Sequence, residues 1–193
     1  MFDDLYIEGE LTEALDESLK NAKEGKIKCP CVPIHGLPGF GKTSITKSWL
    51  KHYNLKHVYI DAGCLYVQEV ETEYLPADNL GQEPQVRLVS GEDLNDLFTP
   101  VKTNVKVILS SDIIDKIDSD TVVVFDNYGF ASKEVREELL KFIRNFIVID
   151  PRVSNAKKQR RIVPLMMVVI ATDEFRDEDK YNDFEKEMFG FKG

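Results

Sequence analysis

The sequence has few cysteines and no long apolar run, and each shortage excludes a class of protein. Its 193 residues include three cysteines, Cys29, Cys31 and Cys64, and no two of them have the C-x-x-C spacing. An odd number of cysteines without a C-x-x-C pair indicates neither a disulfide framework nor a four-ligand zinc site, so we expect reduced thiols in a reducing compartment. The longest apolar stretch, Leu165 to Ala171, is far short of the ~20 residues that cross a bilayer. No membrane association is predicted.

Basic residues are also in the minority, and this limits the partners that we expect. Lys and Arg number 25 against 34 Asp and Glu, a formal net charge of -9. A chain this acidic does not coat nucleic acid by bulk charge, so nucleic acid stays possible only through a local patch. The basic run Lys157 to Arg161 is either such a phosphate contact or, as surface statistics favour, a solvated loop. The acidic N-terminus, Met1 to Asp4, has no export signal, and we expect a cytoplasmic protein.

The length of the chain fits one domain with a sizeable core, so we expect a single domain over residues 1–193. Residues 66–104 are acidic and rich in proline and glycine. This composition predicts an insertion or long loops within that domain.

One glycine-rich stretch, Gly36 to Thr43, has the full G-x-x-x-x-G-K-T spacing of a phosphate-binding loop. In such loops the glycines let backbone N–H groups turn toward the β-phosphate, the lysine reaches the β and γ oxygens, and the threonine hydroxyl can ligate Mg²⁺. The predicted nucleotide-binding residues are therefore Gly36, Pro38, Gly39, Phe40, Gly41, Lys42, Thr43 and Ser44.

The sequence on both sides of this loop agrees with a nucleotide site. Cys31 to His35 indicates a short buried strand, and Ile45, Trp49 and Tyr53 follow at the four-residue steps of a helix. A helix that begins at the loop directs its first amides and its dipole toward the phosphates. We interpret the neighbouring His35 as a packing residue at the strand end rather than a catalytic one, because it has no partner motif.

The third predicted strand along the chain, Thr121 to Asn127, carries a carboxylate near its end. Asp126 follows four apolar residues and can hold the water shell of Mg²⁺ opposite Thr43. We therefore predict Thr43 and Asp126 as the metal-binding residues.

The remaining elements complete an alternation of strands and helices. We expect helices over Leu11 to Ala22, with Thr12 as a possible cap, and after a cap at Ser132, followed by a charged helical tail from Glu178 to Met188. Strands are expected over His57 to Gly63 and Leu165 to Ala171. Short elements are expected at Val105 to Leu109 and Ser111 to Ile117. This pattern predicts a three-layer α/β fold of the P-loop NTPase type, in which helices flank a mainly parallel sheet of four to five strands. The ligand then lies at the carboxyl ends of the strands.

The chain resembles the AAA+ ATPases. Gly36 to Thr43 is similar to their Walker A motif and Val122 to Asn127 to their Walker B motif. Within the family the chain most resembles MoxR-type and midasin-like members. Three stretches carry this resemblance: Asp78 to Pro84 before Walker B, Ser132 to Leu140 after it, and a sensor-1-like strand at Val169 to Thr172. The resemblance covers roughly residues 11 to 175 and implies that ATP and Mg²⁺ bind.

The chain departs from the family pattern at three places. Asn127 stands where the family has a glutamate that polarises water, so hydrolysis is expected to be slow unless Glu134 or Asp173 is the base. Thr172 or Asp173 replaces the usual sensor-1 asparagine. The chain also stops at Gly193, before the helical lid of the family, and Arg176 is the only arginine after the last strand. The residues that the resemblance implies for catalysis are Lys42, Asp126, Asn127, Thr172 and Asp173.

Together these features predict an ATP-binding AAA+-like protein, a slow Mg²⁺-dependent ATPase that acts as a remodelling or loading module. Its expected partners are ATP and either another protein or further copies of itself. Two alternatives stay open: a nucleotide-dependent binding or scaffold protein with little turnover, and a small-molecule kinase, which lacks support from any acceptor-binding motif.

Overall fold

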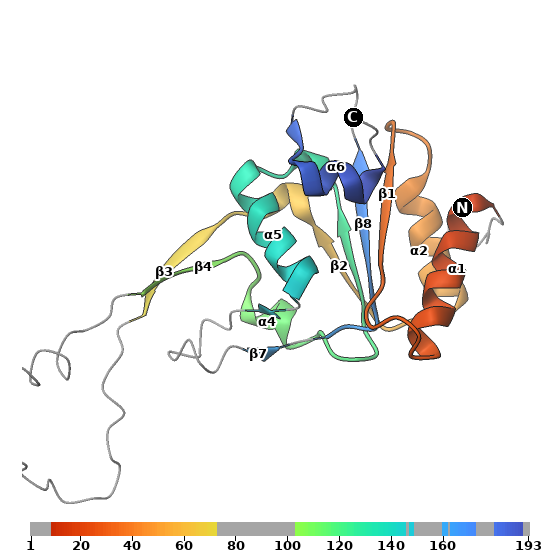
Figure 1. Cartoon of the computed structure of the whole chain (residues 1–193), viewed down its shortest axis with the longest axis horizontal. Helices are drawn as coiled ribbons and strands as arrows, with labels where there is room; N and C mark the ends of the chain where they lie inside the picture. The colour runs from red at the N-terminus through yellow and green to blue at the C-terminus, as the bar shows by residue number, and fades with distance from the viewer. Residues whose placement is uncertain are drawn as a thin grey trace, which may run out of the picture.

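A four-stranded parallel sheet with helices on both faces organises the molecule (Figure 1). The computed structural model describes residues 9–72, 103–145, 147–148, 160–161, 163–172 and 180–190. The strands lie in the order β1 (Cys31–Gly36), β8 (Met166–Thr172), β5 (Val122–Asp126) and β2 (His57–Asp61). All neighbouring pairs are parallel. The predicted three-layer α/β arrangement is confirmed.

The two central strands, β5 and β8, are built almost entirely of apolar residues because both of their faces are covered. Successive side chains of a strand point to opposite faces of the sheet. Val122 and Val124 accordingly belong to one core cluster, and Val123 and Phe125 to the other. The fold therefore has two apolar cores, one on each side of the sheet.

The first core lies under α1 (Glu10–Lys23) and α2 (Lys42–His52), which appear together on one side of the sheet in Figure 1. Trp49 of α2 is fully buried, and its indole Nε1 donates a hydrogen bond of 2.7 Å to Asp16 Oδ1 of α1. This bond satisfies the buried indole and links the two helices.

The prediction that Thr12 caps α1 is wrong, because the helix begins two residues earlier, at Glu10 behind the cap residue Gly9. Thr12 instead sits in the first turn, where its Oγ1 accepts from Gly9 N at 2.9 Å and donates to Gly9 O at 2.8 Å. The acidic first-turn residues Glu10 and Glu13 suit the positive end of the helix dipole, which favours the earlier start.

The second core lies under α4 (Ser111–Ile114), α5 (Lys133–Asn145) and α6 (Asp183–Phe189). The predicted Ser132 cap is confirmed, since its Oγ accepts from Val135 N at 3.3 Å. The tail helix is shorter than expected, because Asn182 caps α6 by accepting from Glu185 N at 2.9 Å. Two short 3-10 turns, η1 (Ala62–Cys64) and η2 (Tyr128–Phe130), follow β2 and β5.

Two antiparallel ribbons lie outside the main sheet. In the first, β3 (Gln68–Thr72) pairs with β4 (Thr103–Val107), and Figure 1 shows this ribbon projecting away from the layered body. Its two strands lie at the ends of the range of about 66–104, where an insertion or long loops are predicted, and most of that range lies outside the described residues. In the second, β6 (Ile147–Val148) pairs with β7 (Arg160–Arg161), the end of the basic run.

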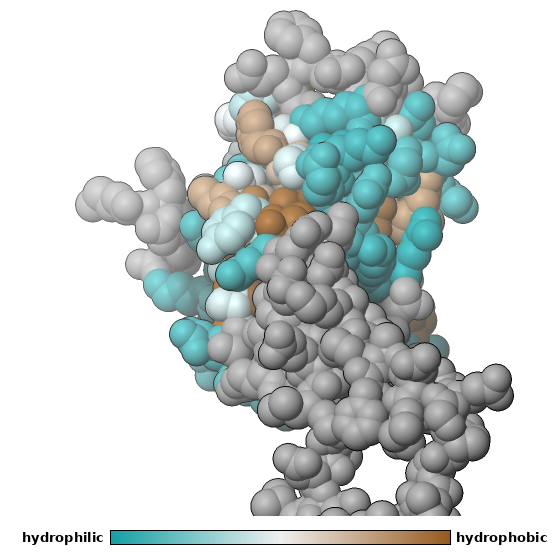
Figure 2. Space-filling model, turned by 90° about the vertical axis from the view of Figure 1, so that its left-hand side faces the viewer, coloured by the Kyte–Doolittle hydropathy of each residue, from teal (hydrophilic) through white to brown (hydrophobic). Residues whose placement is uncertain are grey.

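Polar side chains cover much of the described surface on the side that carries the β3–β4 ribbon, next to a smaller apolar area (Figure 2). No helix within the described ranges is long and apolar enough to cross a membrane.

The environments of the three cysteines predict unequal thiol reactivity. All three are free, and burial raises the pKa of Cys29 and Cys31 to about 12. The pKa of the exposed Cys64 is raised mainly by its hydrogen bond to the Asp61 carboxylate and by the charge of that group. At pH 8 a thiol of pKa 12 is thiolate in a fraction of ~10⁻⁴, and the thiolate is the reactive form.

We therefore expect Ellman's reagent to modify one thiol of the native protein quickly and all three after denaturation. A Cys64→Ser variant is the control and should lose the fast phase. Three fast equivalents in the native protein would contradict the burial of Cys29 and Cys31.

Candidate nucleotide site

The loop between β1 and α2 closes around the side chain of Lys42. Gly39 and Gly41 have φ values of 84° and 74°, in the left-handed region that glycine adopts without strain. Lys42 is only 8% exposed, and its Nζ donates to Gly36 O at 2.7 Å and to Leu37 O at 2.6 Å. The ammonium group therefore lies against the start of the loop, where it contributes a fixed positive charge.

The tip of this loop faces solvent. Leu37, Pro38, Gly39 and Phe40 are exposed, Phe40 by 72%, and Ser44 is exposed on the first turn of α2. An open loop at the N-terminus of a helix, with a lysine bound inside it, suits a phosphate group because N–H groups and positive charge are both available.

The Asp126 carboxylate lies beside this loop. Asp126 is only 4% exposed, and its carboxylate accepts hydrogen bonds from three donors of the protein. Its Oδ2 accepts from Thr43 Oγ1 at 2.9 Å and from Tyr59 OH at 2.5 Å. Its Oδ1 accepts from Asn127 N at 2.8 Å. The structure thus brings together the two predicted metal-binding residues, Thr43 and Asp126, which are 83 positions apart in the sequence.

These two side chains fit a magnesium ion. One hydroxyl and one carboxylate oxygen form a hard oxygen donor set of the kind that Mg²⁺ prefers, with its other positions left to water and phosphate. Their role as metal ligands stays a prediction.

Tyr59 was not predicted from the sequence as a site residue. Burial raises its pKa, and the hydrogen bond to Asp126 raises it further, so the hydroxyl stays protonated and donates a hydrogen bond to the carboxylate. Lys47 of α2 lies over the Tyr59 ring, with Nζ 4.8 Å from the centroid. Tyr59 reaches Asp126 because β2 pairs with β5, with the Cα of Asp61 opposite that of Asp126, and no pattern in the sequence indicates this pairing.

Asn127 contacts a second residue that the sequence analysis missed, Asp61 at the end of β2. The Asn127 amide Nδ2 donates to Asp61 Oδ1 at 3.1 Å, and Gly63 N donates to the same oxygen at 3.0 Å. Asn127 has a left-handed backbone with φ of 56°. Asparagine tolerates this conformation better than most residues with a side chain, which explains why it suits this position.

The other predicted residues are placed less fully. Thr172 ends β8 and pairs in register with Gly36, so it lies beside the start of the loop. Asp173 is outside the described residues. Glu134 is exposed in the first turn of α5. His35 is exposed, and its ring centroid is 6.0 Å from that of Phe189, in agreement with a packing role.

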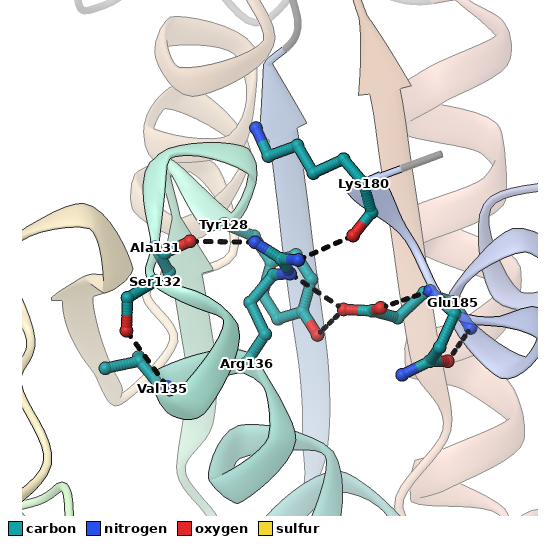
Figure 3. A network of polar contacts seen from close by, with 8 residues as sticks. Tyr128, Ala131, Ser132, Val135, Arg136, Lys180 and Glu185 are labelled. Carbon is teal, nitrogen blue, oxygen red and sulfur yellow. Dashed lines mark hydrogen bonds and ion pairs between the residues drawn. The ribbon is translucent and has the colours of Figure 1, made fainter. Parts of the chain in front are cut away.

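A buried polar network holds the turn that follows Asn127 (Figure 3). Tyr128 OH and Arg136 Nε both donate to Glu185 Oε1, at 2.7 and 3.1 Å. Arg136 also donates from Nη1 to Ala131 O at 2.8 Å and from Nη2 to Lys180 O at 2.6 Å. This network joins the end of β5 to α5 and α6, and sequence patterns gave no sign of it.

Comparison with solved structures supports this architecture. RuvB from Thermotoga maritima, described as a Holliday junction branch migration motor, has a TM-score of 0.51 and 16% identity over 98% of this chain and 47% of that chain. Two mutant forms of the same protein give TM-scores of 0.54 and 0.52 at 15% identity, over 98% of this chain and 48% and 46% of theirs. At this identity the likeness shows the fold alone, and the chain spans less than half the length of RuvB.

No curated protein matches the chain in sequence. Residues 32–181 match the family described as "ATPase family associated with various cellular activities (AAA)". The matched residues include the loop around Lys42, Asp126 and the whole parallel sheet except the first residue of β1. Because the match covers more than half of its length, the chain belongs to the AAA family of ATPases.

Proposed function

We propose that the chain binds ATP with Mg²⁺, hydrolyses it slowly, and uses the cycle to remodel or load a client. The observation that carries the proposal is the contact between Thr43 and Asp126 beside the loop closed by Lys42. A hydroxyl, a carboxylate and an ammonium group are thus available for a phosphate chain and its metal ion at the N-terminus of α2. Membership of the AAA family supports ATP as the ligand.

Each of these residues has a distinct role toward ATP. Lys42 exchanges its contacts with Gly36 and Leu37 for phosphate oxygens and offsets their charge. Thr43 and Asp126 hold Mg²⁺, which when bound neutralises charge on the β- and γ-phosphates. Asn127 offers an amide to the attacking water, and because an amide orients water without accepting its proton, we expect slow turnover.

The client and the assembly are further parts of the proposal. We propose that the partner is another protein or further copies of this chain, an expectation that comes from the resemblance to the AAA+ ATPases. RuvB is described as a Holliday junction branch migration motor, which supports nucleic acid as a second kind of client, while the net charge of -9 weighs against it. A MoxR-like or midasin-like subgroup remains part of the proposal and rests on the motif resemblance.

A nucleotide-dependent scaffold is the second candidate, and Asn127 favours it. Without a carboxylate at this position ATP can close an interface while turnover stays incidental. The two candidates differ in whether a client raises the rate of hydrolysis.

The test is phosphate release from ATP·Mg²⁺ by the whole chain, alone and with added protein or single-stranded DNA, with light scattering in parallel. We expect slow release that rises with protein concentration or with a client, and larger particles when ATP is present. ATP binding without release under every condition supports the scaffold. Rapid hydrolysis by a monomer, independent of concentration, contradicts both.

A further inference from the structure

Asp61 and Asn127 form a side-chain pair at the carboxyl ends of two neighbouring strands. Asp61 is the last residue of β2, and its Cα pairs in register with that of Asp126, the last residue of β5. Asn127 follows directly, and its Nδ2 lies 3.1 Å from Asp61 Oδ1. The Asp61 carboxylate is therefore hydrogen-bonded to Asn127, the residue at the position of the family's water-polarising glutamate.

The chemistry of this pair fixes which way the amide faces. An ionised carboxylate only accepts hydrogen bonds, so the NH₂ group of Asn127 must face Asp61. The carbonyl oxygen Oδ1 of the amide then points away from Asp61 and stays available as an acceptor. If a neutral side chain replaced the carboxylate, either face of the amide would be acceptable there, and the fixed orientation would be lost.

The backbone around the pair is shaped to fit it. Gly63 N donates to the same Asp61 oxygen at 3.0 Å. A Cβ atom on Gly63 would lie 3.3 Å from Asp61 Oδ1, 3.6 Å from Asn127 Cβ and 3.2 Å from Phe130 Cβ. These are tight contacts, so a residue without a side chain lets η1 and η2 approach each other closely. Two hydrogen bonds and two turns thus hold the carboxylate against the amide.

We propose that Asp61 is a positioning residue that holds the Asn127 amide so that its carbonyl oxygen accepts a hydrogen bond from the water attacking ATP. This inference rests on the proposed function. The water oxygen forms a bond to the γ-phosphorus while the bond from that phosphorus to the bridging oxygen breaks, and ADP leaves with the electron pair. The proton of the water passes to an oxygen of the departing phosphate, because the amide does not accept it.

The kinetic test compares kcat and the Kd for ATP between the wild type, a single variant of the pair and a double variant in which the two side chains are exchanged. Asp61→Asn should lower kcat about tenfold through misorientation of the water, with the Kd for ATP changed less than twofold. In the double variant Asp61→Asn with Asn127→Asp, the carboxylate and the amide change places. It should recover at least the wild-type kcat, because a fixed acceptor again faces the water.

The matched control is Asp120→Asn, the same substitution at an exposed aspartate beyond α4. It should leave kcat and Kd unchanged. An Asp61→Asn kcat within twofold of wild type overturns the inference, and so does a double variant no faster than Asp61→Asn. A wild type that binds ATP without releasing phosphate overturns the catalytic role as well.

A second readout does not depend on hydrolysis. The side-chain NH₂ signal of Asn127, assigned in a ¹⁵N–¹H NMR spectrum by its absence in Asn127→Asp, should move toward the position of a free amide in Asp61→Ala and stay in place in Asp120→Asn. An unmoved signal in Asp61→Ala refutes the pair even if ATP binds. Failure of the wild type to bind ATP, with the signal moving as expected, refutes the proposed function and leaves the pair intact as structure.

Discussion

Replacing Lys42 by alanine is expected to weaken the binding of ATP·Mg²⁺ on the order of 100-fold, since a hydrogen bond to a charged group contributes about 1.5–3 kcal/mol. Lys42 Nζ is the one ammonium group that the structure's described residues place inside the loop, against Gly36 O and Leu37 O. Without it the phosphate charge is met by backbone N–H groups and the metal alone. Isothermal titration calorimetry on both proteins measures the change.

The control is Lys51→Ala, which removes an exposed lysine from the last turn of the same helix. It should leave the affinity within twofold of wild type. Lys42 also donates to two loop carbonyls, so its loss could disturb the loop itself. Thermal unfolding of both variants shows whether weaker ATP binding comes with a loss of stability or only with the loss of a phosphate contact. Equal affinity of wild type and Lys42→Ala, with both folded, would remove the assignment of the phosphate-binding loop.

The parts of the site that could be predicted are those coded within a few residues of each other. The loop around Lys42 has a fixed spacing, and the apolar run before Asp126 marks a buried strand by itself. Parallel strands share one carboxyl edge, so the meeting of Thr43 and Asp126 followed from the fold class. The observed hydrogen bond between them agrees with that expectation.

The missed residues depend on which strands are neighbours, and no local pattern fixes that order. Tyr59 and Asp61 belong to the site because β2 lies next to β5, and their bonds join residues 67 and 66 positions apart. A tyrosine and an aspartate at a strand end have ordinary roles in most sheets. Their chemistry becomes specific only when Asp126 and Asn127 are placed opposite.

The same limit explains the tail of the chain. The sequence predicted a charged helical tail there, without a buried ion pair, but Glu185 of α6 is 2% exposed and pairs with Arg136 of α5. A glutamate within a charged stretch indicates an exposed face in most helices. The partner that reverses this expectation lies 49 positions upstream.

Breaking this buried pair is expected to cost more stability than any surface change. Arg136→Met should lower the free energy of unfolding by about 3–5 kcal/mol, because it leaves the Glu185 carboxylate buried without its cation. The loss also leaves Ala131 O and Lys180 O without the donors that Arg136 supplies. Urea denaturation followed by the fluorescence of Trp49, the single and fully buried tryptophan, measures the change.

Two further variants show whether the buried charge is the cause. Lys141→Ala breaks an exposed ion pair with Glu138 and should cost no more than about 1 kcal/mol. The double variant Arg136→Met with Glu185→Gln should be more stable than Arg136→Met alone, because the uncompensated charge is gone. The single amide oxygen can still accept from Tyr128, and the loss of the bond that Asn182 N donates to Glu185 Oε2 at 2.8 Å offsets only part of this gain. Burial and the Glu185 carboxylate raise the pKa of Tyr128, so its hydroxyl remains a donor in the wild type. If the double variant is less stable than Arg136→Met, the uncompensated charge of Glu185 is not the main cause of the lost stability.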